Sequence, residues 1–271
     1  MASSAEELER IKLANESVDS DLIKEAEGVY SELMGSYPVA LGKSASKKER
    51  EEREITKNGN LVYGEVTFET LAIVIEKIKK FYGLPNVGSS GSEGILQSKG
   101  GAFYDLGAGT GKPCIIAALM HNFDICCGVE MLEGLYAVSQ DVANTYSTRG
   151  KTHQFTAGRE FQTHVSFVHG DILNMKLKDW RDGDVVFINS TCFDDPLMER
   201  ISNLALGMRR GTFVISLTRR LNNNDFAVIE SEMYKMSWGE ATVFISQKIT
   251  DPRYVGADAM AAGGGESSED D

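Results

Sequence analysis

A glycine-rich turn preceded by an acid is the stretch of this sequence with the most specific chemistry. In FYDLGAGTGKPC, residues 103–114, glycines alternate with other residues after a short apolar run. A phosphate-binding P-loop is excluded, because Leu106 stands where its first glycine is needed and Pro113 follows Lys112 in place of Ser or Thr. The dinucleotide fingerprint also fails, since Lys112 occupies the position of its third glycine. The remaining pattern is an acid followed by three alternating glycines: Asp105, Gly107, Gly109 and Gly111.

This pattern suits S-adenosyl-L-methionine as the cofactor. Glycines let the backbone pass close beneath a ligand, and the N-terminus of the following helix offers free N–H groups to the cofactor's carboxylate. Asp105, at the end of a strand, can accept hydrogen bonds from the cofactor's amino group. The next two strands end in Glu130, which suits the ribose hydroxyls, and in Asp171, which suits the adenine amino group. Acids at three successive strand ends favour a methyltransferase over a glycine turn with a purely structural role.

An asparagine at the end of the fourth expected strand indicates where the methyl group goes. In FINSTCF the side-chain carbonyl of Asn189 can orient an amine lone pair towards the methyl group, and methyl transfer depends mainly on alignment and desolvation. This chemistry requires no catalytic metal and no covalent nucleophile. An apolar channel would favour the neutral form of a lysine acceptor, and Phe193 and Phe244 are candidate walls. The alternative is that Asn189 caps the helix near Asp195 and both phenylalanines belong to the core.

The elements that position these residues are alternating strands and helices. We expect helices over 113–121, 132–146 and 196–206. Strands are expected over 101–107, 123–130, 163–171, 184–190, 211–217, 233–237 and 241–249. This order predicts an α/β fold of the Rossmann-like class I methyltransferase type. Its mainly parallel seven-stranded sheet is covered on both faces and ends in an antiparallel C-terminal hairpin.

Three regions follow from the pattern along the chain. Residues 1–60 form an N-terminal helical accessory region, because apolar residues recur every three or four positions over 5–34. Within it, GKSASKKEREERE at 42–54 is interpreted as a solvated helix or linker, with a nucleic-acid contact as the alternative. The methyltransferase domain spans 61–252; it includes a helix over 68–81 and a loop at 86–94. An acidic tail over 253–271 has the composition of a disordered end.

Composition limits the classes of protein that this chain can belong to. At 271 residues, with 42% hydrophobic residues, it can bury a sizeable core. The four cysteines lack paired metal-ligand spacing, which favours a reducing compartment. Without a signal peptide or a long apolar run, we expect a soluble intracellular protein with no membrane partner. A net charge of −12 makes direct nucleic-acid binding weak and suits a basic partner.

Several segments resemble the Disruptor-of-telomeric-silencing (Dot-type) family of histone-lysine methyltransferases, which lack the SET fold. The resemblance covers roughly Leu61 to Ile249, in the right order. Its most specific segments are VYGEVTFETLAIVIEKI and VVFINSTCF. The others are FYDLGAGTGKPCIIAAL, CCGVEMLEGLYAVSQ, VHGDIL and MSWGEATVFISQKI. The chain has Val66, Ser190, Val243 and Phe244 where the family tends to carry Thr, Asn and two tyrosines, which predicts a more apolar acceptor channel.

The resemblance implies a role for each matched residue. Tyr63, Gly64 and Glu65 would cover the cofactor, and Asn189 would lie beside both the methyl group and the target amine. Asp105 and Gly107 would bind the methionine part, Glu130 the ribose and Asp171 the adenine. The catalytic candidates are Asn189, Tyr63 and Phe193.

The implied activity is protein-lysine N-methylation of a core histone or nucleosome, in the nucleus. One alternative keeps the fold and the cofactor but places the methyl group on a non-histone protein or a small amine, in the cytoplasm. Another is a binding module that retains the fold without catalysis.

Overall fold

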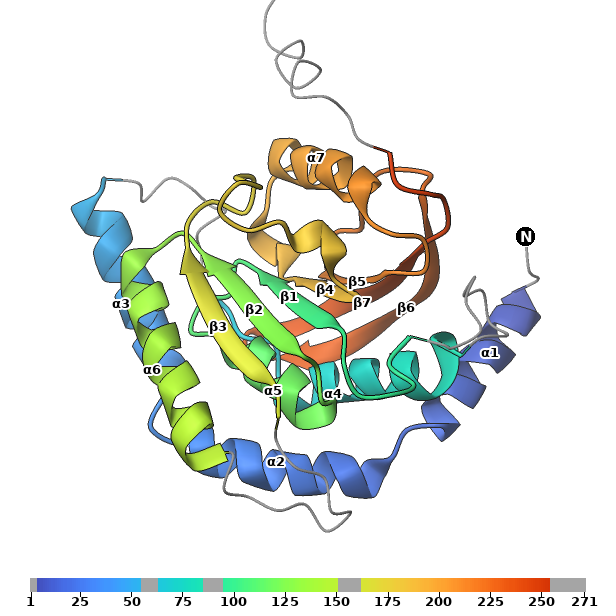
Figure 1. The fold of residues 1–271 in the computed structure, drawn as a ribbon, viewed down its shortest axis with the longest axis horizontal. Coiled ribbons are helices and arrows are strands. Elements are labelled where there is room, and N and C mark those ends of the chain that lie inside the picture. The colour runs from blue at the N-terminus through green and yellow to red at the C-terminus, as the bar shows by residue number, and fades with distance from the viewer. Residues whose placement is uncertain (1–3, 55–62, 85–94, 151–161, 254–271) are drawn as a thin grey trace, which may run out of the picture.

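Seven strands form a single sheet in the computed structural model, which describes residues 4–54, 63–84, 95–150 and 162–253 (Figure 1). The strand order is β3-β2-β1-β4-β5-β7-β6; β1 to β5 run parallel, and β7 pairs antiparallel with β5 and β6. The strands are β1 (Ala102–Leu106), β2 (Ile125–Glu130), β3 (His164–His169), β4 (Val185–Ile188), β5 (Phe213–Leu217), β6 (Phe226–Met236) and β7 (Gly239–Lys248). The predicted α/β architecture, a mainly parallel seven-stranded sheet with an antiparallel C-terminal hairpin, is confirmed.

Both faces of the sheet are covered, and the central strands β1, β4 and β5 are almost entirely buried. Side chains alternate between the faces: Phe103 packs into a core with α4 (Phe68–Lys77) and α5 (Lys112–Met120), and its neighbour Tyr104 packs into a second core with α7 (Asp195–Leu204). Helix α6 (Glu133–Arg149) also covers the first face. The carboxyl ends of β1, β2 and β4 therefore meet at one edge, where parallel α/β sheets bind ligands.

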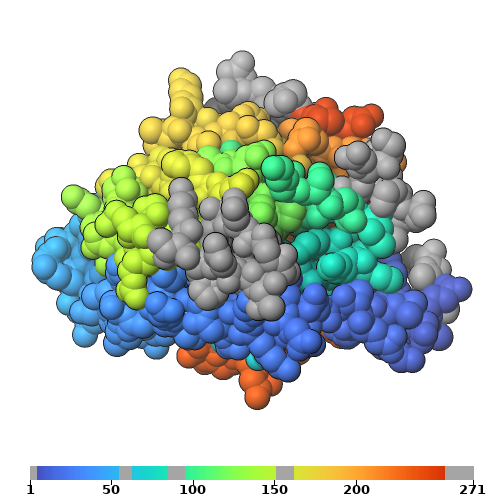
Figure 2. Space-filling model, turned by 60° about the horizontal axis from the view of Figure 1, so that its bottom comes forward, coloured from blue at the N-terminus to red at the C-terminus, as the bar shows by residue number. Residues whose placement is uncertain are grey.

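The N-terminal helices pack against this first core. They are α1 (Ser4–Glu16), α2 (Ser20–Met34) and α3 (Val39–Glu52), and they form a continuous band across one face of the molecule (Figure 2). Buried residues of α2, among them Ala26 and Leu33, share a core with α4 and α5. The predicted division at residue 60 stays a prediction. No helix of the described segments is long and apolar enough to span a lipid bilayer.

The stretch 42–54, predicted as a solvated helix or linker, lies mostly in α3. On its solvent side, Lys47 pairs with Glu51 and Lys48 with Glu52, each at 3.8 Å. The opposite side is buried, which the charged sequence did not indicate. Its buried residues are Gly42, Ser46 and Glu49.

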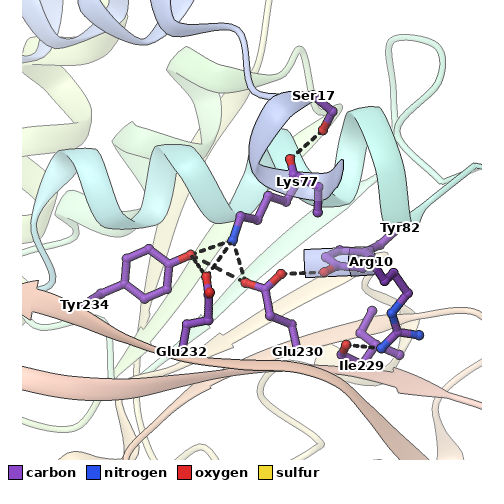
Figure 3. A network of polar contacts seen from close by, with 9 residues as sticks. Arg10, Ser17, Lys77, Tyr82, Ile229, Glu230, Glu232 and Tyr234 are labelled. Carbon is purple, nitrogen blue, oxygen red and sulfur yellow. Dashed lines mark hydrogen bonds and ion pairs between the residues drawn. The ribbon is translucent and has the colours of Figure 1, made fainter. Parts of the chain in front are cut away.

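Strand β6 begins seven residues earlier than predicted, at Phe226 instead of Met233, because its buried charges are paired (Figure 3). The fully buried Lys77 donates to Glu230 at 2.7 Å and to Glu232 at 3.0 Å. Tyr82 donates to the second oxygen of Glu230 at 2.5 Å. A π-helical turn, η2 (Ile78–Tyr82), extends α4 and carries this tyrosine. The loop 86–94 and the tail beyond Arg253 lie outside the described residues.

Candidate active site

A pocket of about 560 Å³ opens at the carboxyl ends of the parallel strands. Its volume lies in the range of small-molecule sites. Nearly every residue predicted from the sequence lines this pocket: Tyr63, Gly64, Glu65, Asp105, Gly107, Gly109, Glu130, Asp171, Asn189 and Phe193.

Gly111 is the exception: it is absent from the lining, and its predicted contact with the cofactor stays a prediction. It precedes α5 with a φ of 83°, and an added Cβ would collide with the ring of Phe167. Its role is to let the chain turn sharply against that ring. Gly107, with a φ of 85°, lines the pocket, and its N–H donates to Val129 O at 3.0 Å, which ties the glycine turn to β2.

Asp105 is a carboxylate in the pocket wall without a hydrogen-bond partner in the part of the chain that the structure describes. Its side chain is fully buried, and neither oxygen accepts a hydrogen bond from any described residue. Burial raises the pKa of Asp105 well above its usual value, and the nearby Glu130 raises it further. A buried carboxylate is unfavourable without a compensating donor. A ligand with an ammonium group would supply that donor, so the wall fits the amino group of S-adenosyl-L-methionine.

Glu130 braces the glycine turn from the end of β2. One carboxylate oxygen accepts from Gly109 N at 2.7 Å, and the other accepts from Leu132 N at 2.8 Å. Burial raises the pKa of Glu130, and these backbone N–H groups lower it in part. Asp171 follows β3 and accepts from Leu173 N at 2.8 Å. Both acids thus lie at strand ends in the pocket, as predicted, and their contacts with ribose and adenine stay predictions.

The segment Tyr63–Glu65 lies over the glycine turn. The hydroxyl of Tyr63 donates to Glu65 and lies 2.8 Å from Thr110 Oγ1, within the turn. Burial and the charge of Glu65 raise the pKa of Tyr63. Lys112 Nζ donates to both oxygens of Glu65, each at 2.8 Å. The sequence did not indicate this role for Lys112.

Asn189 connects the covering segment to the end of β4. Its Nδ2 donates to Gly64 O at 3.0 Å, and its Oδ1 is buried without a partner among the described residues. The capping alternative is wrong, because Asp194 caps α7 by accepting from Leu197 N at 2.9 Å. Asn189 is therefore free to accept a hydrogen bond from an amine.

The two predicted walls differ in position. Phe193 also belongs to the second core, and the contact of either ring with an acceptor lysine stays a prediction. Phe193 lines the pocket, and its ring lies 3.4 Å from the position of a Cβ on Gly107. Phe244 is absent from the lining, because it pairs with Ser216 inside the sheet, one position before β5 ends. Trp238, from the turn between β6 and β7, lines the pocket and packs on Gly64.

Two of the departures from the family pattern also lie away from the pocket. Val243 belongs to the core, and Ser190 donates to Leu217 O at 2.7 Å, beneath the site. The prediction that these positions make the channel more apolar is wrong. Val66 does line the pocket.

The sheet order, with one antiparallel hairpin and a pocket at the carboxyl strand ends, is that of a Rossmann-like class I methyltransferase. The family model "Histone methylation protein DOT1" matches residues 90–239, which is more than half of the chain. The chain belongs to this family.

Curated relatives share the name histone-lysine N-methyltransferase, H3 lysine-79 specific. The protein from Candida albicans is 28% identical over 156 residues, which cover 50% of this chain and 11% of the relative. The one from Caenorhabditis elegans is 28% identical over 169 residues, 60% of this chain and 15% of the relative. The matched region is thus a small part of each relative. Among solved structures, TrmN from Thermus thermophilus is 14% identical with a TM-score of 0.44, covering 57% of this chain and 46% of that chain.

Proposed function

We propose that this chain is an S-adenosyl-L-methionine-dependent protein-lysine N-methyltransferase that acts on a core histone. One observation carries the proposal: Asp105 and Asn189, in the wall of the same pocket, both present buried oxygen atoms that no described residue hydrogen-bonds. The first oxygens suit the ammonium group of the cofactor. The second suits the N–H of an acceptor amine.

The bound cofactor supplies a methyl group on a positively charged sulfur, which an amine lone pair can attack. Asp105 would bind the cofactor's amino group, and the glycine turn would pass beneath its methionine part. Asn189 Oδ1 would accept from the acceptor amine and so fix the direction of its lone pair. Phe193 and Trp238 would exclude water, and their apolar surroundings favour the neutral amine that the transfer requires.

The substrate class is supported by family membership and by the relatives. Because the relatives are named for lysine 79 of histone H3, that lysine is the first acceptor to examine. A nucleosome is the natural form in which to present it. The nucleus is the corresponding location.

The test is transfer from radiolabelled S-adenosyl-L-methionine to nucleosomes, free histones and a cell extract, followed by mass spectrometry of the labelled lysine. We expect label on histone H3 with the parent protein and labelling about a hundredfold slower with Asn189→Ala. Label confined to a non-histone protein or to small amines would overturn the histone substrate. Failure of the parent to bind the cofactor in calorimetry would overturn the methyltransferase assignment.

A further inference from the structure

Helix α3 runs along α6 in the opposite direction (Figure 1). Just before α3, Tyr37 Oη lies 2.7 Å from Thr145 Oγ1, near the end of α6. Near the end of α3, Glu49 contacts the first residues of α6. Side-chain contacts at both ends therefore fix the register of α3 along α6.

Glu49 binds the turn that follows the predicted ribose-binding strand. Its two oxygens accept from Glu133 N at 2.9 Å and from Gly134 N at 2.7 Å. Arg53 Nη2 forms an ion pair with Glu49 Oε1 at 2.6 Å. A carboxylate is favourable at a helix N-terminus, where backbone N–H groups have no partner within the helix. Since Glu49 is only 8% exposed, it forms a buried link between α3 and the edge of the pocket.

Gly42, on the same buried side of α3, allows the helix backbone to touch Tyr63. An added Cβ on Gly42 would lie within 3.0 Å of Tyr63 ring atoms Cε1 and Cζ. On the other edge of the ring, a Cβ on Gly109 would lie 2.6 Å from Cε2. The ring thus lies between two glycines, one in α3 and one in the cofactor turn. Glycine is unfavourable inside a helix. Here the absence of a side chain allows α3 to lie directly against the Tyr63 ring.

We infer that α3 is a positioning element for the cofactor site. Gly42 lets it press Tyr63 onto the glycine turn, and Glu49 fixes its distance from the end of β2. The inference rests on the proposed function, since it assumes that Tyr63 covers S-adenosyl-L-methionine. It assigns the N-terminal helices a part in cofactor affinity.

The chain offers a matched pair of variants. Gly28 lies in α2, exposed, and no other described residue comes within 4 Å of an added Cβ there, whereas Gly42 lies in α3 against Tyr63. Both substitutions, Gly28→Ala and Gly42→Ala, raise helix propensity equally. We expect Gly28→Ala to bind the cofactor as the parent does. Gly42→Ala should bind it about tenfold more weakly, because displacement of a covering group disturbs the bound geometry.

A coupling measurement separates positioning from general damage. In a Tyr63→Leu background the ring is gone, so Gly42→Ala should cause no further loss of affinity. The KM for the cofactor should rise in Gly42→Ala, while single-turnover transfer at saturating cofactor stays near that of the parent. Circular dichroism and Tm establish that each variant is folded.

Three results are decisive. Equal affinity of Gly42→Ala and Gly28→Ala for S-adenosyl-L-methionine would overturn the inference. So would an equal loss from Gly42→Ala with and without Tyr63. A parent protein that fails to bind the cofactor would instead refute the proposed function, so the two failures are distinguishable.

Discussion

Lys112 Nζ donates to both carboxylate oxygens of Glu65, each at 2.8 Å, from the first position of helix α5. A cation at a helix N-terminus is unfavourable, and this one is also buried, with its side chain 6% exposed and that of Glu65 11% exposed. The pair connects the covering segment to the helix that follows the glycine turn. Glu65 therefore compensates a charge that the helix itself disfavours.

Loss of one member of this pair should be worse than loss of both. Lys112→Met leaves a buried carboxylate without its partner and should reduce the free energy of unfolding by about 3 kcal/mol. The double variant Lys112→Met/Glu65→Gln should lose less than Lys112→Met alone. Urea denaturation measures both, and Lys24→Met, whose side chain is 77% exposed, is the control. Additive losses in the double variant would contradict a direct pair.

Asp105→Asn should stabilise the protein without cofactor and weaken cofactor binding. The substitution replaces a buried acid, whose ionised form has no partner among the described residues, with a neutral amide, for a gain of about 1 kcal/mol. Binding should weaken at least about thirtyfold, because a charged contact is lost. Urea denaturation and calorimetry on the same samples test both. Loss of stability in Asp105→Asn would contradict the unpaired state of this residue.

Cofactor affinity should fall as the pH is lowered. In the free protein the pKa of Asp105 is raised above its usual 3.8, so the protonated form persists to higher pH. An ammonium ligand requires the ionised form, so binding releases a proton and weakens as the pH falls through the raised pKa. Calorimetry in two buffers of different ionisation enthalpy counts the protons released. Asp105→Asn is the control, and unchanged proton release in that variant would contradict the assignment.

Asn189→Ala should affect transfer more than cofactor binding. Its Oδ1 is the unpaired acceptor, so loss of the side chain should slow single-turnover transfer by about a hundredfold. Cofactor affinity should change less, because the variant retains Asp105 and Glu130. Rapid-quench kinetics and calorimetry provide the two values. An effect on affinity alone would place the role of Asn189 in its hydrogen bond to Gly64 O.

Acid should weaken the ion pairs of Asp225 with Lys248 and Arg253, which lie where β6 begins and β7 ends. Hydrogen bonds from Arg253 and Lys248 lower the pKa of Asp225 from 3.8 to about 2. Because the folded-state pKa is lowered, the stabilisation is present above the usual pKa and is lost as the pH falls towards about 2. Asp225→Asn should be less stable than the parent near neutral pH, with a difference that shrinks in acid. Asp21→Asn, on an exposed side chain, should show no such difference.

Residues at strand ends were predictable from the sequence. An apolar run, a glycine turn and a following helix determine where Asp105 must lie, and the same logic places Glu130, Asp171 and Asn189 at the same edge of the sheet. Tyr63 and Glu65 precede a helix and follow no strand, so only the family resemblance indicated them.

Contacts between distant segments were not predictable in this way. Gly42 and Glu49 lie in a charged helix without an apolar stripe, so nothing in the spacing distinguished their side from the solvated one. Lys112 served only to exclude a dinucleotide site. Phe244 was misplaced because its position depends on the pairing register of β5 with β7, which sequence alone leaves open.

The band of N-terminal helices has a consequence for the order in which the chain assembles. At one end of the band, Arg10 of α1 donates to Ile229 O of the edge strand β6, a contact between residues 219 positions apart (Figure 3). Contacts between residues so far apart in the sequence form late, and they reduce the rate of folding. During synthesis α1 emerges long before β6, so this contact cannot form until the edge strand is in place. The first helix of the chain is thus expected to complete the fold, and hydrogen exchange during refolding should protect it last.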